Sequence, residues 1–114
     1  VEPREFIDEA ARIDPVRARQ FAEDLEFFRT GLVVNQVRTP DDRALSGAIT
    51  GALKRFYGFN VKPLGEIAYE DSVWMSVRSR APLMAGRADS IAARDTAAVC
   101  RTVLGIIQEY RSLR

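Results

Sequence analysis

Apolar side chains recur at helical spacing in the first part of the chain. Between Pro3 and Ile13 this spacing predicts one helix. Asp14 is followed by a proline, which is the pattern of an N-cap and a first helical turn, so a second helix is predicted to run to about Phe28. Together they predict a helical insertion or hairpin over residues 1–29.

A strand, a helix and a second strand are predicted next. The run Gly31–Val37 is rich in β-branched residues and has no polar alternation before its fifth residue, which is typical of a strand buried on both faces. Val61–Ala68 has strand character too, although Pro63 and Gly65 predict that it is short or begins after the proline. Strand, helix and strand in this order predict a βαβ unit with parallel strands.

The helix between the two strands has clear signals at both ends. Thr39 supplies a capping hydroxyl, Pro40 suits the first turn, and two carboxylates follow. Gly58 is a suitable C-cap. Gly47 and Gly51 within this helix are interpreted as positions of close packing on the sheet.

The last third of the chain is predicted to be mostly helical. A short helix after residues 69–71 is expected to end at Arg80, with 81–83 extended and 84–88 in a loop. A final helix is expected to begin at a cap formed by Asp89 or Ser90. Its predicted apolar stripe consists of Ile91, Ala98, Val99, Val103, Ile106, Ile107 and Tyr110.

These elements predict an α/β fold with one βαβ unit flanked by helices. Two parallel strands alone make a poor sheet, because each has a free edge and parallel sheets are normally covered on both faces. We therefore expect a part of a larger α/β protein, or a chain whose sheet is completed by another chain. The composition, 46% hydrophobic and 29% charged, is that of an ordinary globular protein.

Several kinds of chemistry are excluded by composition. The chain contains no histidine and one cysteine, Cys100, so it has no internal disulfide, His/Cys zinc site or histidine-based triad. Neither the phosphate loop G-x-x-x-x-G-K-[ST] nor G-x-G-x-x-G occurs. The 17 basic and 16 acidic residues give a net charge of +1, which argues against nucleic acid as a partner. Paired carboxylates at 41–42 and 70–71 are interpreted as helix-start residues.

A binding site is expected at the carboxyl ends of the two strands, where open α/β sheets bind ligands. Parallel pairing places the segments 35–38 and 68–71 on the same edge. The amide of Asn35 can both donate and accept hydrogen bonds, which suits a purine edge, although an asparagine at a strand end also serves as a turn residue. Trp74 is interpreted as a core or pocket-wall residue.

Several segments resemble a known family in their order and spacing. They are Leu32–Arg38, Lys54–Gly58, Pro63–Trp74 and Val77–Leu83. Together they are similar to the C-terminal part of MinD/ParA-type P-loop ATPases, in the branch near the flagellar-number regulators FlhG and FleN. The resemblance implies a partial three-layer parallel-sheet P-loop NTPase fold, with residues 30–114 as the C-terminal βαβα part of the ATPase domain.

The same resemblance implies adenine recognition. Asn35 would contact the base, and residues 68–73 would form the loop over it. The residues assigned to nucleotide binding are Asn35, Arg38, Ala68, Tyr69, Asp71 and Val73. ATP is the expected cofactor, with Mg in the parent protein; the parent would be an ATPase, but hydrolysis is not assigned to this segment because it lacks the phosphate-binding motifs. The expected role is a nucleotide-dependent spatial or flagellar-number regulator.

The expected partners are a second copy or another protein. A cytoplasmic location is expected, and the stretch 106–114, with apolar and arginine side chains, also suits peripheral contact with the inner membrane. The alternative hypothesis is a non-catalytic protein-interaction module that never had a phosphate loop and that binds its partner through the hairpin and the sheet edge.

Overall fold

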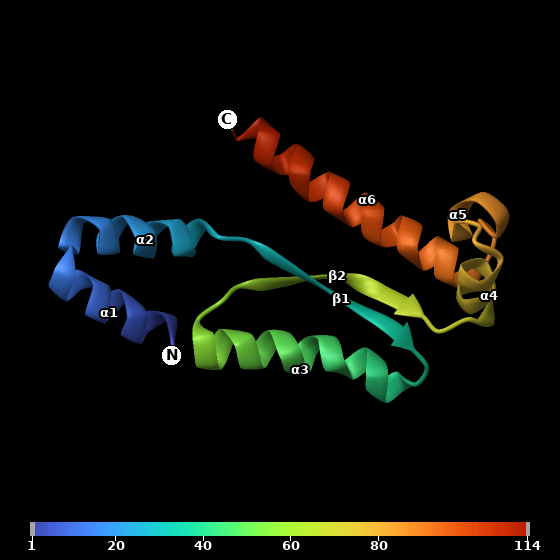
Figure 1. Cartoon of the computed structure of the whole chain (residues 1–114), viewed down its shortest axis with the longest axis horizontal. Helices are drawn as coiled ribbons and strands as arrows, with labels where there is room; N and C mark the ends of the chain where they lie inside the picture. Colours follow the sequence, from blue (N-terminus) through green and yellow to red (C-terminus); the bar gives the residue numbers. More distant parts are fainter. Residues whose placement is uncertain (1, 114) are drawn as a thin grey trace.

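The computed structural model describes residues 2–113, and its elements alternate between helix and strand in the middle of the chain (Figure 1). In chain order they are α1 (Pro3–Ile13), α2 (Pro15–Phe27), β1 (Thr30–Val37), α3 (Pro40–Tyr57), β2 (Val61–Ala68), α4 (Asp71–Ser79), α5 (Leu83–Gly86) and α6 (Ile91–Ser112).

The two strands are parallel and are joined by α3, which confirms the βαβ unit and the mixed α/β class. Thr30 is paired with Val61 at one end, and Val37 with Ala68 at the other. Figure 1 shows α3 along one side of the strand pair and α6 along the other, with α6 rising away from the strands toward its C-terminus. Within the described residues the sheet has two strands, so each strand has one free edge.

The predicted helix caps are confirmed where they depend on local sequence. Thr39 Oγ1 accepts a hydrogen bond from Asp42 N–H at 3.3 Å, and Gly58 ends α3 with a left-handed φ of 72°. Asp14 caps α2 through Arg17 N–H at 3.1 Å. Of the two candidates for α6, Ser90 is the cap and accepts from Ala93 N–H.

Four predictions from the sequence are wrong. β2 begins at Val61 and includes Pro63, which an edge strand tolerates because one of its sides needs no donors. Residues 83–86, expected in an extended piece and a loop, form the short helix α5. A Cβ at Gly47 or Gly51 would meet no atom within 4 Å, so these glycines do not pack closely on the sheet. Ile91 is 59% exposed, so the predicted stripe of α6 does not share one covered face.

The chain is extended and buries little of itself. The radius of gyration is 18.8 Å, against about 13 Å for a compact chain of this length. Its accessible surface is 9072 Å², about 2,800 Å² above the roughly 6,300 Å² expected of a compact protein of this mass. The buried apolar residues are Ala18, Val37, Ala92 and Ala93. A large apolar surface therefore remains open to contact with further polypeptide.

Among the described residues, none of the helices has the length and apolarity that crossing a bilayer requires.

Candidate functional site

The end of β1 contains a bulge that redirects two polar side chains. Val34 pairs with Glu66 and Val37 with Ala68, so Asn35 and Gln36 together stand opposite one residue of β2. Gln36 has a left-handed φ of 58°, which is uncommon outside glycine, and its N–H donates to Asn35 Oδ1 at 2.9 Å. Bulges and such backbone conformations occur preferentially next to functional sites.

The end of β2 places an aromatic ring beside this bulge. Tyr69 N–H donates to Val37 O at 2.9 Å, which extends the strand pairing by one rung. The guanidinium carbon of Arg38 lies 3.9 Å from the centroid of the Tyr69 ring, and the Tyr69 hydroxyl lies 3.4 Å from Asp71 Oδ1. A cation–π contact and a hydrogen bond therefore hold the ring from two sides.

A cavity of about 270 Å³ lies between these strand ends and α4. Its lining consists of Asn35, Gln36, Ala68, Tyr69, Glu70, Val73, Trp74 and Val77. The bulge contributes amide groups, and α4 contributes an apolar and aromatic wall. This volume is slightly below the range of about 300–1,000 Å³ found for whole drug-sized ligands.

The structure brings all six predicted site residues to one region, in two different positions. Asn35, Ala68, Tyr69 and Val73 line the cavity itself. Arg38 and Asp71 do not line it; they contact Tyr69 from outside.

Gln36 and Glu70 also line the cavity; they fall within the segments expected at this edge but were not among the residues assigned to nucleotide binding. Val77 was not expected in the site, and Trp74 was expected only as a core or pocket-wall residue. Val77 follows Val73 by one helical turn, so helical spacing could have found it. That the Gln36 side chain reaches the cavity had no local signal, because it depends on the bulge in the register between the strands.

Two carboxylates tie α6 to this edge of the sheet. Asp95 Oδ2 accepts from Ala68 N–H at 2.9 Å, and Glu70 Oε2 accepts from Ala92 N–H at 2.9 Å. These bonds join residues far apart in the chain and hold the loop between β2 and α4 in place. Glu70 precedes α4, as predicted, but its side chain makes no cap bond there and instead accepts from the first turn of α6.

The other acidic pair stabilises the start of α3. Asp42 Oδ2 accepts hydrogen bonds from the N–H groups of Arg38 and Thr39 at 2.8 and 3.0 Å. The bond from Arg38 N–H, followed by that from Thr39 N–H, holds the pKa of Asp42 below its ordinary value. This carboxylate is engaged by backbone donors and serves as a cap.

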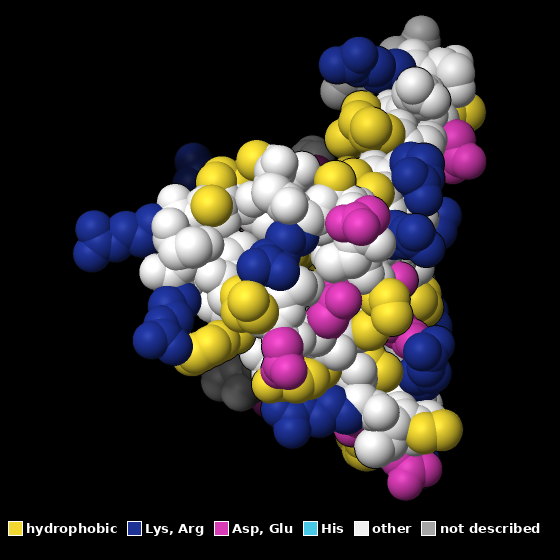
Figure 2. All heavy atoms as spheres, turned by 90° about the vertical axis from the view of Figure 1, so that its right-hand side faces the viewer, with side chains coloured by type: hydrophobic (Ala, Val, Ile, Leu, Met, Phe, Trp, Pro, Cys, Tyr) yellow, Lys and Arg dark blue, Asp and Glu magenta, His cyan; other side chains and the backbone are white. Residues whose placement is uncertain are grey.

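The face that carries the strand ends has mixed charges. Figure 2 looks onto this end of the molecule and shows basic and acidic side chains interspersed with hydrophobic ones. Residues 2–113 contain no group of three or more His, Cys, Asp or Glu side chains that could hold a metal ion.

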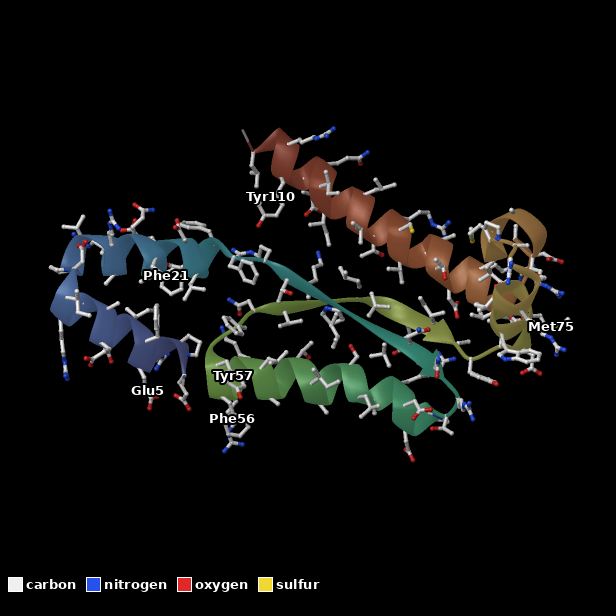
Figure 3. The ribbon with its side chains drawn as sticks, in the orientation of Figure 1. Glu5, Phe21, Phe56, Tyr57, Met75 and Tyr110 are labelled. Carbon is white, nitrogen blue, oxygen red and sulfur yellow. The ribbon has the colours of Figure 1, made fainter. Side chains whose placement is uncertain are left out.

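The stretch 106–114 has apolar side chains that face the strands. Ile106, Ile107 and Tyr110 line a groove of about 300 Å³ together with Gly31 and Leu64, and Figure 3 shows Tyr110 pointing from α6 to the side on which the strands lie. Leu113 is 84% exposed. Arg114, the last residue of the stretch, lies outside the described residues.

Comparisons with known proteins do not identify a relative that has this cavity. No family model matches the chain, and no match was found among curated proteins or solved structures. The chemistry of the cavity therefore rests on its own side chains.

Proposed function

We propose that the chain is the C-terminal, base-binding part of an ATPase of the MinD/ParA type, in which the cavity at the strand ends holds the adenine of ATP. The observation that carries this proposal is the meeting of Asn35 and Tyr69 around one cavity at the carboxyl ends of neighbouring parallel strands. Open α/β sheets bind their ligands at this edge.

The side chains suggest a division of roles. The Asn35 amide donates to a ring nitrogen of adenine and accepts from its exocyclic amine, while its second carbonyl lone pair stays with Gln36 N–H. Tyr69, fixed by Arg38 and Asp71, and Trp74 offer aromatic faces to the base. Val73 provides an apolar wall.

The phosphates and Mg of ATP require groups outside this cavity. The 114 residues contain no phosphate loop, and the described residues contain no metal-binding cluster. In this proposal the phosphate loop and the magnesium-binding acids belong to another part of the parent ATPase. The parent ATPase would act in the cytoplasm, with or without contact with the inner membrane. Its role would be that of a spatial or flagellar-number regulator.

The test is ATP binding by the full-length protein with Asn35→Ala. Loss of two hydrogen bonds, each worth about 0.5–1.5 kcal/mol, should weaken binding about tenfold or more. Asn60→Ala is the matched control, because Asn60 lies before β2 at the far end of the sheet and contacts Lys54 Nζ at 2.6 Å. Equal affinity of wild type and Asn35→Ala would refute the role of Asn35.

A second candidate function is a protein-interaction module without nucleotide. The observation that favours it is the large accessible surface of 9072 Å², with few buried residues. Absence of nucleotide binding in the full-length protein, together with a stable complex by native mass spectrometry, would favour this function over the first.

A further inference from the structure

Two residues other than glycine have a left-handed backbone in the described part of the chain. They are Gln36, with a φ of 58°, and Arg80, with a φ of 55°. The Cβ atom makes this conformation unfavourable for both, and neither belongs to the short polar residue types that adopt it most readily. The two positions therefore share a backbone strain, and they differ in what surrounds them.

The conformation of Arg80 is explained by the end of α4. Arg80 is the C-cap residue, and its N–H donates to Val77 O at 3.1 Å. The next N–H, that of Ala81, donates to Ser76 O at 3.0 Å. Helices often end at a left-handed residue, and these bonds involve the backbone alone. Arg80 does not line the cavity at the strand ends, so its left-handed backbone serves the helix end.

Gln36 lies inside a strand, where no helix end explains its backbone. Neighbouring side chains of a regular strand point to opposite faces, so a regular β1 would separate Asn35 from Gln36. In the bulge both residues stand opposite one residue of β2, and both line the same cavity. The left-handed backbone of Gln36 therefore accompanies the arrival of a second amide residue at the cavity.

The hydrogen bond between these two residues does not involve the Gln36 side chain. It runs from the backbone N–H of Gln36 to Asn35 Oδ1 at 2.9 Å. The side-chain amide of Gln36 has two N–H donors and an acceptor oxygen. It is one methylene farther from the backbone than the amide of Asn35, so the two amides are suited to different sides of one ligand.

Adenine offers two sides to such a pair of amides. Its exocyclic amine has two N–H groups, one beside ring atom N1 and the other beside N7. Glutamine and asparagine form paired hydrogen bonds with the N7 side, accepting from the amine and donating to N7. One amide at each side would thus engage both N–H groups of the amine.

We propose that Gln36 is a specificity-determining residue of the cavity and recognises the N7 side of adenine. Its amide oxygen accepts from the exocyclic amine and its amide nitrogen donates to N7, while Asn35 takes the N1 side. This role of Gln36 rests on the proposed adenine site. It also gives a reason for the strained backbone, because a glycine at this position would have no amide to offer.

The test compares adenosine with 7-deazaadenosine, in which a C–H group replaces N7. Both nucleosides are titrated into the full-length protein, and binding is followed by the fluorescence of Trp74, which lines the cavity. The wild type should bind adenosine about fivefold more tightly, because 7-deazaadenosine lacks the acceptor for the Gln36 amide.

Gln36→Gly should lose this preference and become more stable at the same time. It should bind the two nucleosides with equal affinity, and its melting temperature, measured by circular dichroism, should rise by about 4 °C because glycine relieves the left-handed strain. Gln36→Asn keeps an amide and tolerates the backbone but is one methylene shorter, so it should lose the preference too. This second variant separates the reach of the amide from the mobility of a glycine.

Arg80→Gly is the matched control. It relieves the same kind of strain outside the cavity, so its melting temperature should also rise, while its preference for adenosine should stay at the wild-type value.

The outcomes distinguish the role of Gln36 from the adenine site itself. A wild type that binds both nucleosides equally would overturn the role of Gln36 and leave the adenine site in place. So would a preference for adenosine that persists in Gln36→Gly or Gln36→Asn, or a Gln36→Gly variant that is no more stable than the wild type. A wild type that binds neither nucleoside would contradict the adenine site, and the role of Gln36 with it.

Discussion

The two ends of the strand pair are held in different ways. At the carboxyl ends, the bonds from Ala68 N–H to Asp95 and from Ala92 N–H to Glu70 fasten β2, α4 and α6 to one another. At the amino ends, α6 lies farther from the strands, and an open groove of about 300 Å³ separates α6 from them.

This difference shows where the chain places its specific polar contacts. Hydrogen bonds between distant residues fix the edge at which a ligand of an open α/β sheet binds, and a fixed edge holds Asn35 and Tyr69 in one arrangement. Toward the amino ends, Val103, Ile106 and Ile107 of α6 face Leu64 across the open groove. Substitutions at the two ends should therefore have unequal effects.

The largest effect is expected from Gly65→Ala, in the second half of β2. Gly65 has a φ of 144°, and a Cβ there would lie 2.9 Å from Val99 Cγ2, so both the backbone and α6 must shift. We expect a loss of about 3 kcal/mol in the free energy of unfolding, measured by urea denaturation.

Gly31→Ala, near the amino end, is the matched comparison. A Cβ there would overlap Leu64 Cδ1 and lie 2.7 Å from Leu64 Cγ, closer than the contact at Gly65; the φ of Gly31 is not left-handed, however, and Leu64 borders the open groove into which its side chain can turn. We expect a loss of about 1 kcal/mol. Equal losses for the two glycines would contradict the difference between the two ends.

A smaller effect is expected from Asp95→Ala. The substitution leaves the partly buried Ala68 N–H without its acceptor, which should lower the free energy of unfolding by about 2 kcal/mol. Glu109→Ala removes a carboxylate from the same helix at the open groove and should change stability by less than about 0.5 kcal/mol. If Asp95→Ala left the free energy of unfolding unchanged, this bond would not be what holds the carboxyl ends together.

The smallest effect is expected in the stability of the chain at acid pH, through the cap at the start of α3. The pKa of Asp42 is below its ordinary value of 3.8, so its contribution is complete above that value and is lost as the pH falls through 3.8 toward the lowered pKa. Asp42→Asn should therefore flatten the acid limb of the stability curve, measured by denaturation between pH 5 and pH 2. An unchanged acid limb would contradict the assignment of Asp42 as a charged cap.

The features that the sequence predicted are those set by neighbouring residues. The caps at Asp14, Thr39 and Gly58 are local, and the order of strand, helix and strand is enough to predict parallel pairing. The convergence of Asn35 and Tyr69 followed from that pairing.

Features that depend on register or on tertiary contact could not be predicted in the same way. The bulge at Gln36 arises from the alignment of β1 with β2, and the strand conformation of Pro63 depends on β2 having a free edge. Gly47 and Gly51 looked like packing positions because their spacing is compatible with close approach, but within residues 2–113 a Cβ at either position would meet no atom within 4 Å. The role of Asp95 was hidden because its partner, Ala68 N–H, is far away in sequence.

The proposal of a base site can be tested most directly through Trp74, the single tryptophan, which lines the cavity. Its fluorescence in the full chain would be followed during titration with adenosine, which probes the base site without phosphates. We predict a saturable change with a dissociation constant of about 1 mM or below, lost in Asn35→Ala and kept in Asn60→Ala. No saturable change, or the same change in Asn35→Ala as in the wild type, would contradict the assignment of this cavity to adenine.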